Sequence, residues 1–141
     1  ATIEAMYPDD FLHGRYRQEV IVYNGKIYVF GGGKNTGDTC SLQKLPVFDL
    51  KKNEWSFIDT VADIDSKSYP EKRKFHSCLK FESDSLVYVF GGFHYDFGTQ
   101  TTKVVENCVW RLDLNNLAWE KLNIKMPLLT YFHAACLNQV K

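Results

Sequence analysis

The sequence has no net charge, no long hydrophobic run and few cysteines. Its 141 residues carry 17 basic and 17 acidic side chains, which removes the electrostatic reason to expect nucleic acid or an anionic membrane as the main partner. No stretch approaches the roughly 20 apolar residues of a membrane helix. The first residues also lack the charged and apolar segments of a secretory signal. These absences favour a cytoplasmic protein, with the nucleus as the other location that fits.

The cysteines lack the spacing of a metal site or a redox motif. No C-x-x-C pair occurs among Cys40, Cys78, Cys108 and Cys136, so neither a zinc ribbon nor a thioredoxin-like motif is indicated. Free thiols are the usual state of such cysteines in a reducing compartment. We therefore expect free thiols, no metal and no cofactor.

Motifs of catalysis are missing as well. The sequence has no G-x-S-x-G nucleophile elbow, and no Ser, His and Asp stand in the context of a catalytic triad. Its glycine doublets lack the spacing of a P-loop or a dinucleotide site, and no amphipathic helix follows them. We therefore expect a protein that is not an enzyme, and the glycines are better explained by backbone geometry.

What the sequence does contain is an internal repeat. Tyr-Val-Phe-Gly-Gly occurs at 28–32 and again at 88–92, 60 positions later. Each copy is followed by a segment with a tryptophan, Trp55 in the first copy and Trp119 in the second. The segment RKFHSCLKF, from Arg73, returns as TYFHAACLN, from Thr130. A repeat of this kind is typical of arrays and propellers.

Each copy predicts four short strands. In the second copy they lie near 76–82, 86–90, 108–114 and 118–122, and helical periodicity is weak throughout. In the first copy Asn24-Gly25 is a strong signal for a tight hairpin turn. Four antiparallel strands, with glycines after the second and a tryptophan on the fourth, are typical of a β-propeller blade.

We therefore predict an all-β fold, a partial propeller of about two blades with flanking strands. The tryptophans Trp55 and Trp119 are expected to pack between adjacent blades, and Trp110 to lie in the core. The predicted ranges are the end of a preceding blade and a loop at 1–17, a blade at 18–59, an inter-blade loop at 60–75, a blade at 76–123, and a loop with the first strand of a next blade at 124–141.

The doublet, the aromatic residue after it and the later tryptophan resemble the Kelch repeat. The segments RYRQEVIVYNGKIYVFGGG, RKFHSCLKF and MPLLTYFHAACL are similar, more narrowly, to the group of Kelch domain-containing protein 10, also called scruin-like at the midline. This resemblance implies a protein-interaction module, either the substrate receptor of a cullin–RING ubiquitin ligase or an adaptor in stress-kinase signalling. Implied partners are a peptide or C-terminal degron, elongin and cullin subunits bound outside this chain, and a Ser/Thr phosphatase. Since other Kelch propellers bundle actin, a cytoskeletal module is the alternative.

Candidate binding residues precede the innermost strands. The basic residues at these places are Arg15, Arg17, Arg73 and Lys74. Several guanidinium groups could hold one carboxylate there, and surface salt bridges with Glu19 or Glu71 are the other interpretation. Thr130 replaces Arg73 in the next unit, which leaves this cluster incomplete. Resemblance to Kelch receptors that read C-terminal degrons adds His76, Ser77 and Tyr131.

The loop after the second doublet carries further candidates. His94, Tyr95 and Phe97 are either anchors for a protein partner or packed under the loop itself. His76 is also interpreted as a hydrogen-bonded structural residue near the channel, and the loop after the first doublet is similarly long.

Two blades do not close a propeller, which usually has at least four. Open sheet edges pair readily with other chains. The chain is therefore expected to be a fragment of a longer protein, or to associate with further copies through its open blade edges.

Overall fold

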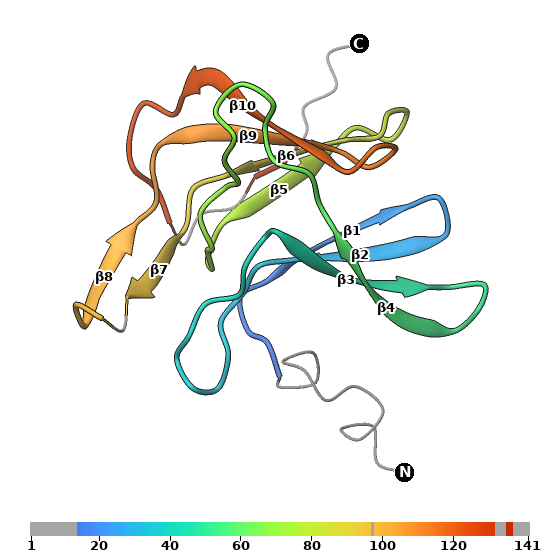
Figure 1. Cartoon of the computed structure of the whole chain (residues 1–141), viewed down its shortest axis with the longest axis horizontal. Helices are drawn as coiled ribbons and strands as arrows, with labels where there is room; N and C mark the ends of the chain where they lie inside the picture. The colour runs from blue at the N-terminus through green and yellow to red at the C-terminus, as the bar shows by residue number, and fades with distance from the viewer. Residues whose placement is uncertain (1–13, 97, 132–134, 137–141) are drawn as a thin grey trace.

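The computed structural model describes residues 14–96, 98–131 and 135–136, and these residues form strands, turns and loops but no helix. Ten strands make two four-stranded antiparallel sheets and one hairpin (Figure 1). The all-β prediction and the four-stranded blades are thus confirmed. The strands are β1 Glu19–Tyr23, β2 Lys26–Phe30, β3 Lys44–Asp49, β4 Glu54–Asp59, β5 Ser77–Lys80, β6 Leu86–Phe90, β7 Phe93–Asp96, β8 Thr101–Val104, β9 Cys108–Asp113 and β10 Ala118–Lys125.

The first sheet follows the chain in the order β1-β2-β3-β4. Its first turn, Asn24-Gly25, has positive φ at both residues, 47° and 70°, as expected for a tight hairpin. Asp49 shapes the turn between β3 and β4 by accepting hydrogen bonds from the N–H groups of Lys51 and Lys52. Local turn chemistry therefore sets the meander of this sheet.

The second sheet has the order β10-β9-β6-β5, because β7 and β8 are inserted between β6 and β9 as a separate hairpin. The segment after the second glycine doublet, which the sequence presents as a long loop, is therefore mostly strand. Asp96 explains the turn, since its carboxylate accepts a hydrogen bond from the N–H of Gly98 at 2.8 Å. The hairpin stands apart from both sheets in Figure 1.

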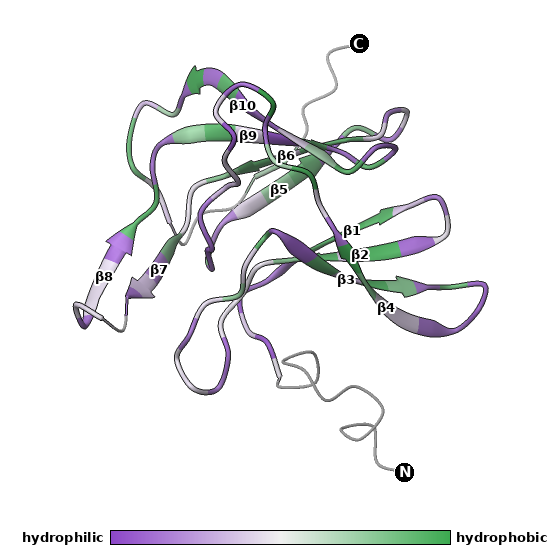
Figure 2. Cartoon of the chain, viewed as in Figure 1, coloured by the Kyte–Doolittle hydropathy of each residue, from purple (hydrophilic) through white to green (hydrophobic). Residues whose placement is uncertain are grey.

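The core lies between the facing sides of the two four-stranded sheets. Fully buried Phe30 and Leu45 of the first sheet meet Val87, Leu112 and Trp119 of the second. Figure 2 shows the matching pattern, with hydrophobic colour along the strands and hydrophilic colour at many of the turns. Burial of large side chains here holds the sheets together, each contributing on the order of 2–3 kcal/mol.

The tryptophans differ from one another in their packing. Trp119 is 2% exposed and its Nε1–H donates across the gap to the carbonyl of Leu42 and the hydroxyl of Thr60. Trp110 is buried beside it, as predicted. Trp55 is 36% exposed and packs on Phe48 of its own sheet, so its place between two blades stays a prediction. No second sheet covers that face among the described residues.

Several expectations fall outside the described residues. These are a strand of a preceding blade in residues 1–6 and most of the strand expected near 133–139.

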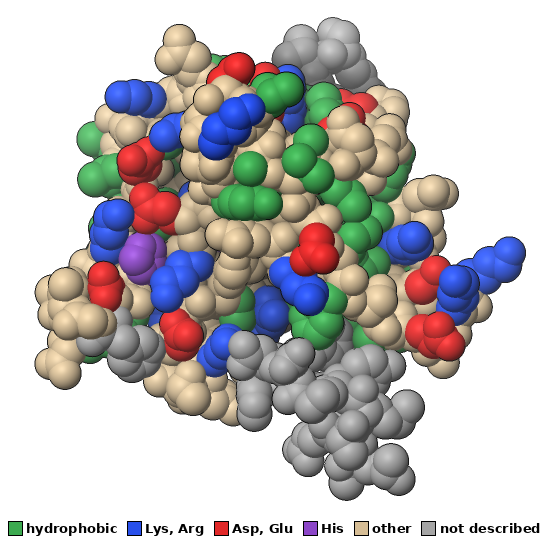
Figure 3. All heavy atoms as spheres, viewed as in Figure 1, with side chains coloured by type: hydrophobic (Ala, Val, Ile, Leu, Met, Phe, Trp, Pro, Cys, Tyr) green, Lys and Arg blue, Asp and Glu red, His purple; other side chains and the backbone are tan. Residues whose placement is uncertain are grey.

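The cysteines of the described residues are free thiols, and burial raises the pKa of Cys78 well above its usual value. Within the described part of the chain, no helix has the length and apolar character needed to cross a membrane. Basic and acidic side chains alternate on the face shown in Figure 3.

Candidate functional site

The segments that enter β1 and β5 occupy equivalent places in the two sheets. Backbone hydrogen bonds join Tyr16 to Gly33 in both directions, at 3.1 and 2.8 Å. The same two bonds join Lys74 to Phe93, at 2.9 and 3.0 Å. Each segment therefore lies against the residue that follows a glycine doublet, which brings the predicted arginines next to the doublets.

The arginines at these entries bind the doublets. Arg15 Nη1 donates to the carbonyl of Gly31, and Arg73 Nη1 donates to the carbonyl of Gly91, both at 3.1 Å. Arg73 also donates from Nε to the carbonyl of Glu71 and is 1% exposed. Burial lowers the pKa of Arg73 to about 10. The guanidinium of Arg73 therefore donates hydrogen bonds to backbone carbonyls and is not accessible at the surface.

The glycine doublets leave no room for side chains, because neighbouring segments lie close against them. Gly31 has a φ of 60°, and a Cβ built on it would lie 2.3 Å from the carbonyl oxygen of Arg73. The N–H of Gly32 donates to that same carbonyl at 2.9 Å, and the N–H of Gly92 donates to Thr130 at 2.7 Å. The structure therefore supports the backbone interpretation of the doublets and places Thr130 where Arg73 stands in the preceding unit.

Aromatic rings form a continuous row beside these entries. We define the aromatic row as Tyr16, Phe75, Phe93 and Tyr131. Phe75 and Phe93 are stacked, with centroids 5.1 Å apart and planes 9° apart. Tyr16 meets Phe75 edge-on at 6.4 Å, and Tyr131 meets Phe93 edge-on at 5.1 Å. The two tyrosines are 39% and 47% exposed, so both ends of the row reach the surface.

Two cations accompany the aromatic row. The guanidinium of Arg17 lies 5.1 Å from the ring centroid of Phe75. Lys74 is 6% exposed, and its Nζ donates to the hydroxyl of Tyr16 at 2.7 Å. Arg17 and Phe75 occupy equivalent positions and both have positive φ, 57° and 56°. Such backbone is uncommon for residues with a Cβ and concentrates at functional sites.

The structure separates the predicted site residues into surface and interior. Arg17 and Tyr131 are exposed, Arg17 over Phe75 and Tyr131 against Phe93, whereas Arg73, His76 and Ser77 are buried. Lys74, which precedes β5 with Arg73, is buried as well. The remaining side chains of the aromatic row, Tyr16, Phe75 and Phe93, were not singled out as site residues. The signal that could have found Tyr16 is its alignment with Tyr131, which was already a candidate.

The candidates on the β7–β8 hairpin are less exposed than a free loop would leave them. His94 is 8% exposed and its Nε2 lies 3.1 Å from a carboxylate oxygen of Glu71, which also binds Lys103. Tyr95 is half-buried. Phe97 lies outside the described residues.

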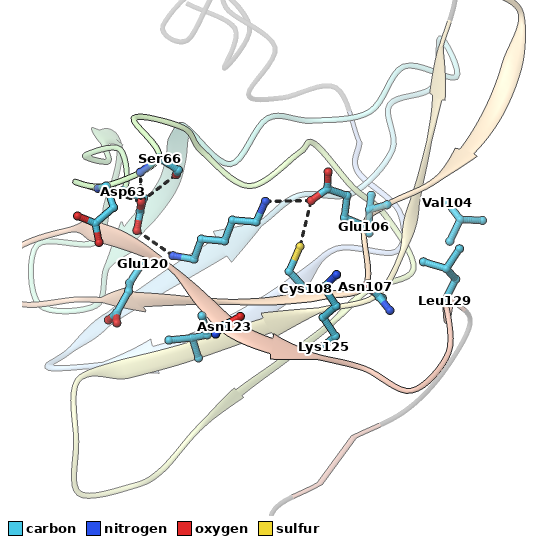
Figure 4. A pocket seen from close by; sticks show the side chains of 14 residues that line it. Asp63, Ser66, Val104, Glu106, Asn107, Cys108, Glu120, Asn123, Lys125 and Leu129 are labelled. Carbon is cyan, nitrogen blue, oxygen red and sulfur yellow. Dashed lines mark hydrogen bonds and ion pairs between the residues drawn. The ribbon is translucent and has the colours of Figure 1, made fainter.

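A cavity of about 720 Å³ lies beside β10 and the connection between the blades (Figure 4). Lys121 spans it: its backbone N–H donates to Asp63 at 3.0 Å, and its Nζ lies 3.0 Å from Glu106. Glu106 also accepts a hydrogen bond from the thiol of Cys108. Backbone N–H groups of Ser66 and then Lys121 lower the pKa of Asp63 to about 2. These polar groups therefore form hydrogen bonds and ion pairs with one another along the lining of the cavity.

The described residues contain no group of three or more His, Cys, Asp or Glu side chains placed to hold a metal ion. The geometry at the strand entries instead offers aromatic faces and one surface guanidinium. Aromatic side chains and arginine are enriched among the residues that dominate protein interfaces.

The chain is similar to known Kelch proteins along nearly its whole length. The family described as the KLHDC2/KLHL20/DRC7 Kelch-repeats domain matches residues 4–141. Kelch domain-containing protein 10 homolog of Drosophila melanogaster is 34% identical, over 86% of this chain and 21% of that protein. Kelch domain-containing protein 10 is 32% identical in Xenopus tropicalis, over 93% of this chain and 29% of that protein. The Homo sapiens protein of the same name is 31% identical, over 92% of this chain and 27% of that protein.

The chain therefore spans between about a fifth and three tenths of the length of these relatives. Among solved structures, the structure of YjhT superposes with a TM-score of 0.54 over 80% of this chain and 39% of that one, at 14% identity. At that identity the likeness concerns the fold alone.

Proposed function

The chain belongs to the Kelch-repeat family, whose domains are protein-interaction modules, and from this premise we propose that it captures a peptide segment of a protein partner. We propose further that it does so as part of a substrate receptor of a cullin–RING ubiquitin ligase or of a related signalling adaptor. In this proposal the chain binds the partner and is not itself an enzyme, because other subunits of the complex catalyse the reaction. Elongin, cullin and phosphatase partners would bind regions outside this chain.

The observation that carries this proposal is the aromatic row with Arg17 at its side. Aromatic side chains and arginine are the residues that most often dominate the binding energy of protein interfaces. The exposed rings of Tyr16 and Tyr131 provide apolar contact area. A guanidinium forks two donors toward a carboxylate, so Arg17 suits the free C-terminus of a peptide or an acidic side chain.

The test is peptide binding measured by fluorescence anisotropy, with peptides that end in a free carboxylate and the same peptides ending in an amide. Arg17→Ala and Tyr131→Ala should each weaken binding by about tenfold or more, because each removes an anchor. Lys52→Ala, an exposed lysine of the β3–β4 turn, is the matched control and should bind normally. Arg73→Ala is unsuitable, since its buried guanidinium supports the fold.

Unchanged affinity in both variants, with circular dichroism showing an intact fold, would remove the aromatic row from the proposal. The ligase assignment is tested separately in the full-length protein. Precipitation of elongin and cullin subunits with it is the expected result. Sedimentation with actin filaments, without those subunits, would overturn the receptor role in favour of a cytoskeletal one.

A further inference from the structure

The lysine beside the aromatic row is buried without an acidic partner. Lys74 is 6% exposed, and none of the ion pairs among the described residues includes it. Its Nζ donates to the hydroxyl of Tyr16 at 2.7 Å and lies 4.9 and 5.5 Å from the ring centroids of Tyr16 and Phe93. Lysine is almost never fully buried unless it is paired. Within the described part of the chain, aromatic faces and one hydroxyl are what this charge has in place of an acid.

The contact with Lys74 decides what the hydroxyl of Tyr16 can do. An ammonium group has three donors and no acceptor, so the oxygen of Tyr16 must accept this hydrogen bond. The phenolic proton then points away from Lys74, and it has no acceptor among the described residues. The hydrogen bond between the two side chains is only partly buried, and Tyr16 is 39% exposed. Tyr16 is therefore a hydrogen-bond donor at an exposed end of the aromatic row.

The ring of Tyr16 is held in place by its surroundings. Backbone hydrogen bonds join Tyr16 to Gly33 in both directions. The ring lies so close to Gly33 that a Cβ built there would be 2.6 Å from the ring carbon Cζ and 2.8 Å from the hydroxyl oxygen. Tyr16 also meets Phe75 edge-on, with centroids 6.4 Å apart. The hydroxyl is thus fixed before a ligand arrives, which reduces the entropic cost of binding.

Another pair of a lysine and a tyrosine in the chain provides a contrast. The Nζ of Lys80 lies 5.2 Å from the ring centroid of Tyr23, but it donates to nearby backbone carbonyls, at 2.8 and 2.9 Å in the two shortest bonds. The hydroxyl of Tyr23 donates to the side chain of Asn115 at 2.9 Å. Both polar groups of this pair therefore have partners within the chain. At Tyr16 and Lys74, the proton and the charge are left for a ligand.

We propose that Tyr16 binds the carboxylate of an acidic side chain, Asp or Glu, in the peptide that the aromatic row captures, and that Lys74 positions Tyr16 for this contact. An ionised carboxylate only accepts hydrogen bonds, so it can take the open proton of Tyr16. Its charge also offsets that of Lys74 nearby. Hydrogen bonds to an ionised acceptor are roughly twice as strong as those between neutral groups. A glutamate of the peptide is therefore preferred over a glutamine.

The acidic side chain is a second anion, in addition to the one that Arg17 suits. The guanidinium of Arg17 lies over Phe75, and no acid among the described residues pairs with it either. A peptide has one C-terminal carboxylate, which offsets one positive charge, whereas Arg17 and Lys74 carry two. The carboxylate for the second charge has to come from a side chain. The captured peptide therefore belongs to an acidic class.

The choice of a peptide as the carrier rests on the proposed function, but the carboxylate site can be tested without a peptide. Sodium acetate is titrated at constant ionic strength into the chain labelled with ¹³C at Cζ of tyrosine, and the NMR signals are followed. The signal that is missing from Tyr16→Phe identifies Tyr16, and it should shift saturably. Lys74→Met, which keeps an unbranched side chain without the charge, should weaken acetate binding by about tenfold or more. An unresponsive Tyr16 signal, or an unchanged acetate affinity in Lys74→Met, would overturn the site.

The second experiment measures selectivity by fluorescence anisotropy. Pairs of peptides with free C-termini differ only by Glu or Gln, which is placed at each position in turn. At one position the Glu peptide should bind about tenfold more tightly or better. Tyr16→Phe keeps the ring and should abolish this preference, whereas a merely structural role of Tyr16 would weaken both peptides equally. Tyr23→Phe and Lys80→Met are the matched controls and should keep the preference.

Equal affinity for Glu and Gln at every position, or a preference that survives in Tyr16→Phe, would overturn the assignment of the acidic side chain. The failure of the proposed function gives a different result. In that case no peptide binds the chain, while acetate still shifts the signal of Tyr16 and still requires Lys74, so the carboxylate site stands and its peptide carrier does not.

Discussion

At the scale of single residues, three glycines show how backbone and neighbours combine. Gly31 has positive φ and meets the carbonyl of Arg73 from the next blade. Gly25 has positive φ, but a Cβ there would have no atom within 4 Å. Gly14 has neither constraint. The repeat revealed that the doublets matter, but the atom that excludes a side chain at Gly31 comes from a residue far along the sequence.

Alanine substitutions should therefore destabilise the chain in a fixed order. Gly31→Ala combines positive φ with a backbone clash and should cost roughly 2–4 kcal/mol in free energy of unfolding. Gly25→Ala adds only the conformational strain, about 1 kcal/mol, and Gly14→Ala should be neutral. Urea denaturation followed by fluorescence measures all three. Equal effects at Gly31 and Gly25 would contradict the close approach between blades.

At the scale of elements, the edge strand β10 is covered by the connection between the blades. The N–H of Val61 donates to Leu117 at 2.8 Å, and the N–H of Trp119 donates to Val61 at 2.9 Å. The carboxylate of Asp63 then accepts from the N–H of Lys121. The backbone of Val61 and then the side chain of Asp63 thus bind successive backbone groups along the edge of β10. These bonds protect part of an edge that would otherwise be open to pairing with another strand.

The stability of this cover should depend on pH. The pKa of Asp63 is about 2 in the folded chain, against an ordinary value of 3.8. Its contribution is therefore complete above about pH 4 and is lost as the pH falls toward about 2. Asp63→Asn should lower the free energy of unfolding at pH 6, and this difference from the parent chain should shrink across that range.

Urea denaturation at several pH values measures the effect, with Asp65→Asn as the control. Asp65 lines the same cavity but does not accept the Lys121 hydrogen bond. A difference between the Asp63→Asn variant and the parent that stays constant from pH 6 to about pH 2 would contradict the role of the charged carboxylate.

At the scale of the whole molecule, one face of the first sheet is apolar and open. Val20, Val22 and Trp55 on it are 53%, 58% and 36% exposed. The equivalents of Val20 and Trp55 in the second sheet, Cys78 and Trp119, are buried against the first sheet. The open face therefore has the chemistry of a surface that another blade covers.

We predict that the chain associates through this face. Light scattering after size exclusion at micromolar concentration should show species larger than a monomer. Val22→Lys should shift them toward monomer, because it places a charge in the apolar contact. Ile64→Lys, on the connection between the blades, is the control, since Ile64 is already 77% exposed. A monodisperse monomer in the unmodified chain would contradict the prediction.

The sequence by itself determined the all-β fold, the repeated four-stranded blades and the Asn24-Gly25 turn. Alternation, turn residues and repetition are local signals, so they can be interpreted without knowing which segments meet. The burial of Trp110 could also be predicted from the sequence, because the residues next to it in the chain are those of an ordinary core strand.

Only the tertiary structure decided which polar residues are accessible. It buried Arg73 and His76, exposed Trp55, and brought Arg15, Lys34, Lys44 and Lys72 to one cavity. It also placed Phe93 on Phe75, which no spacing in the sequence indicates. The reason is physical: these contacts join residues from different blades and loops, and their formation depends on how the two sheets pack rather than on any local pattern.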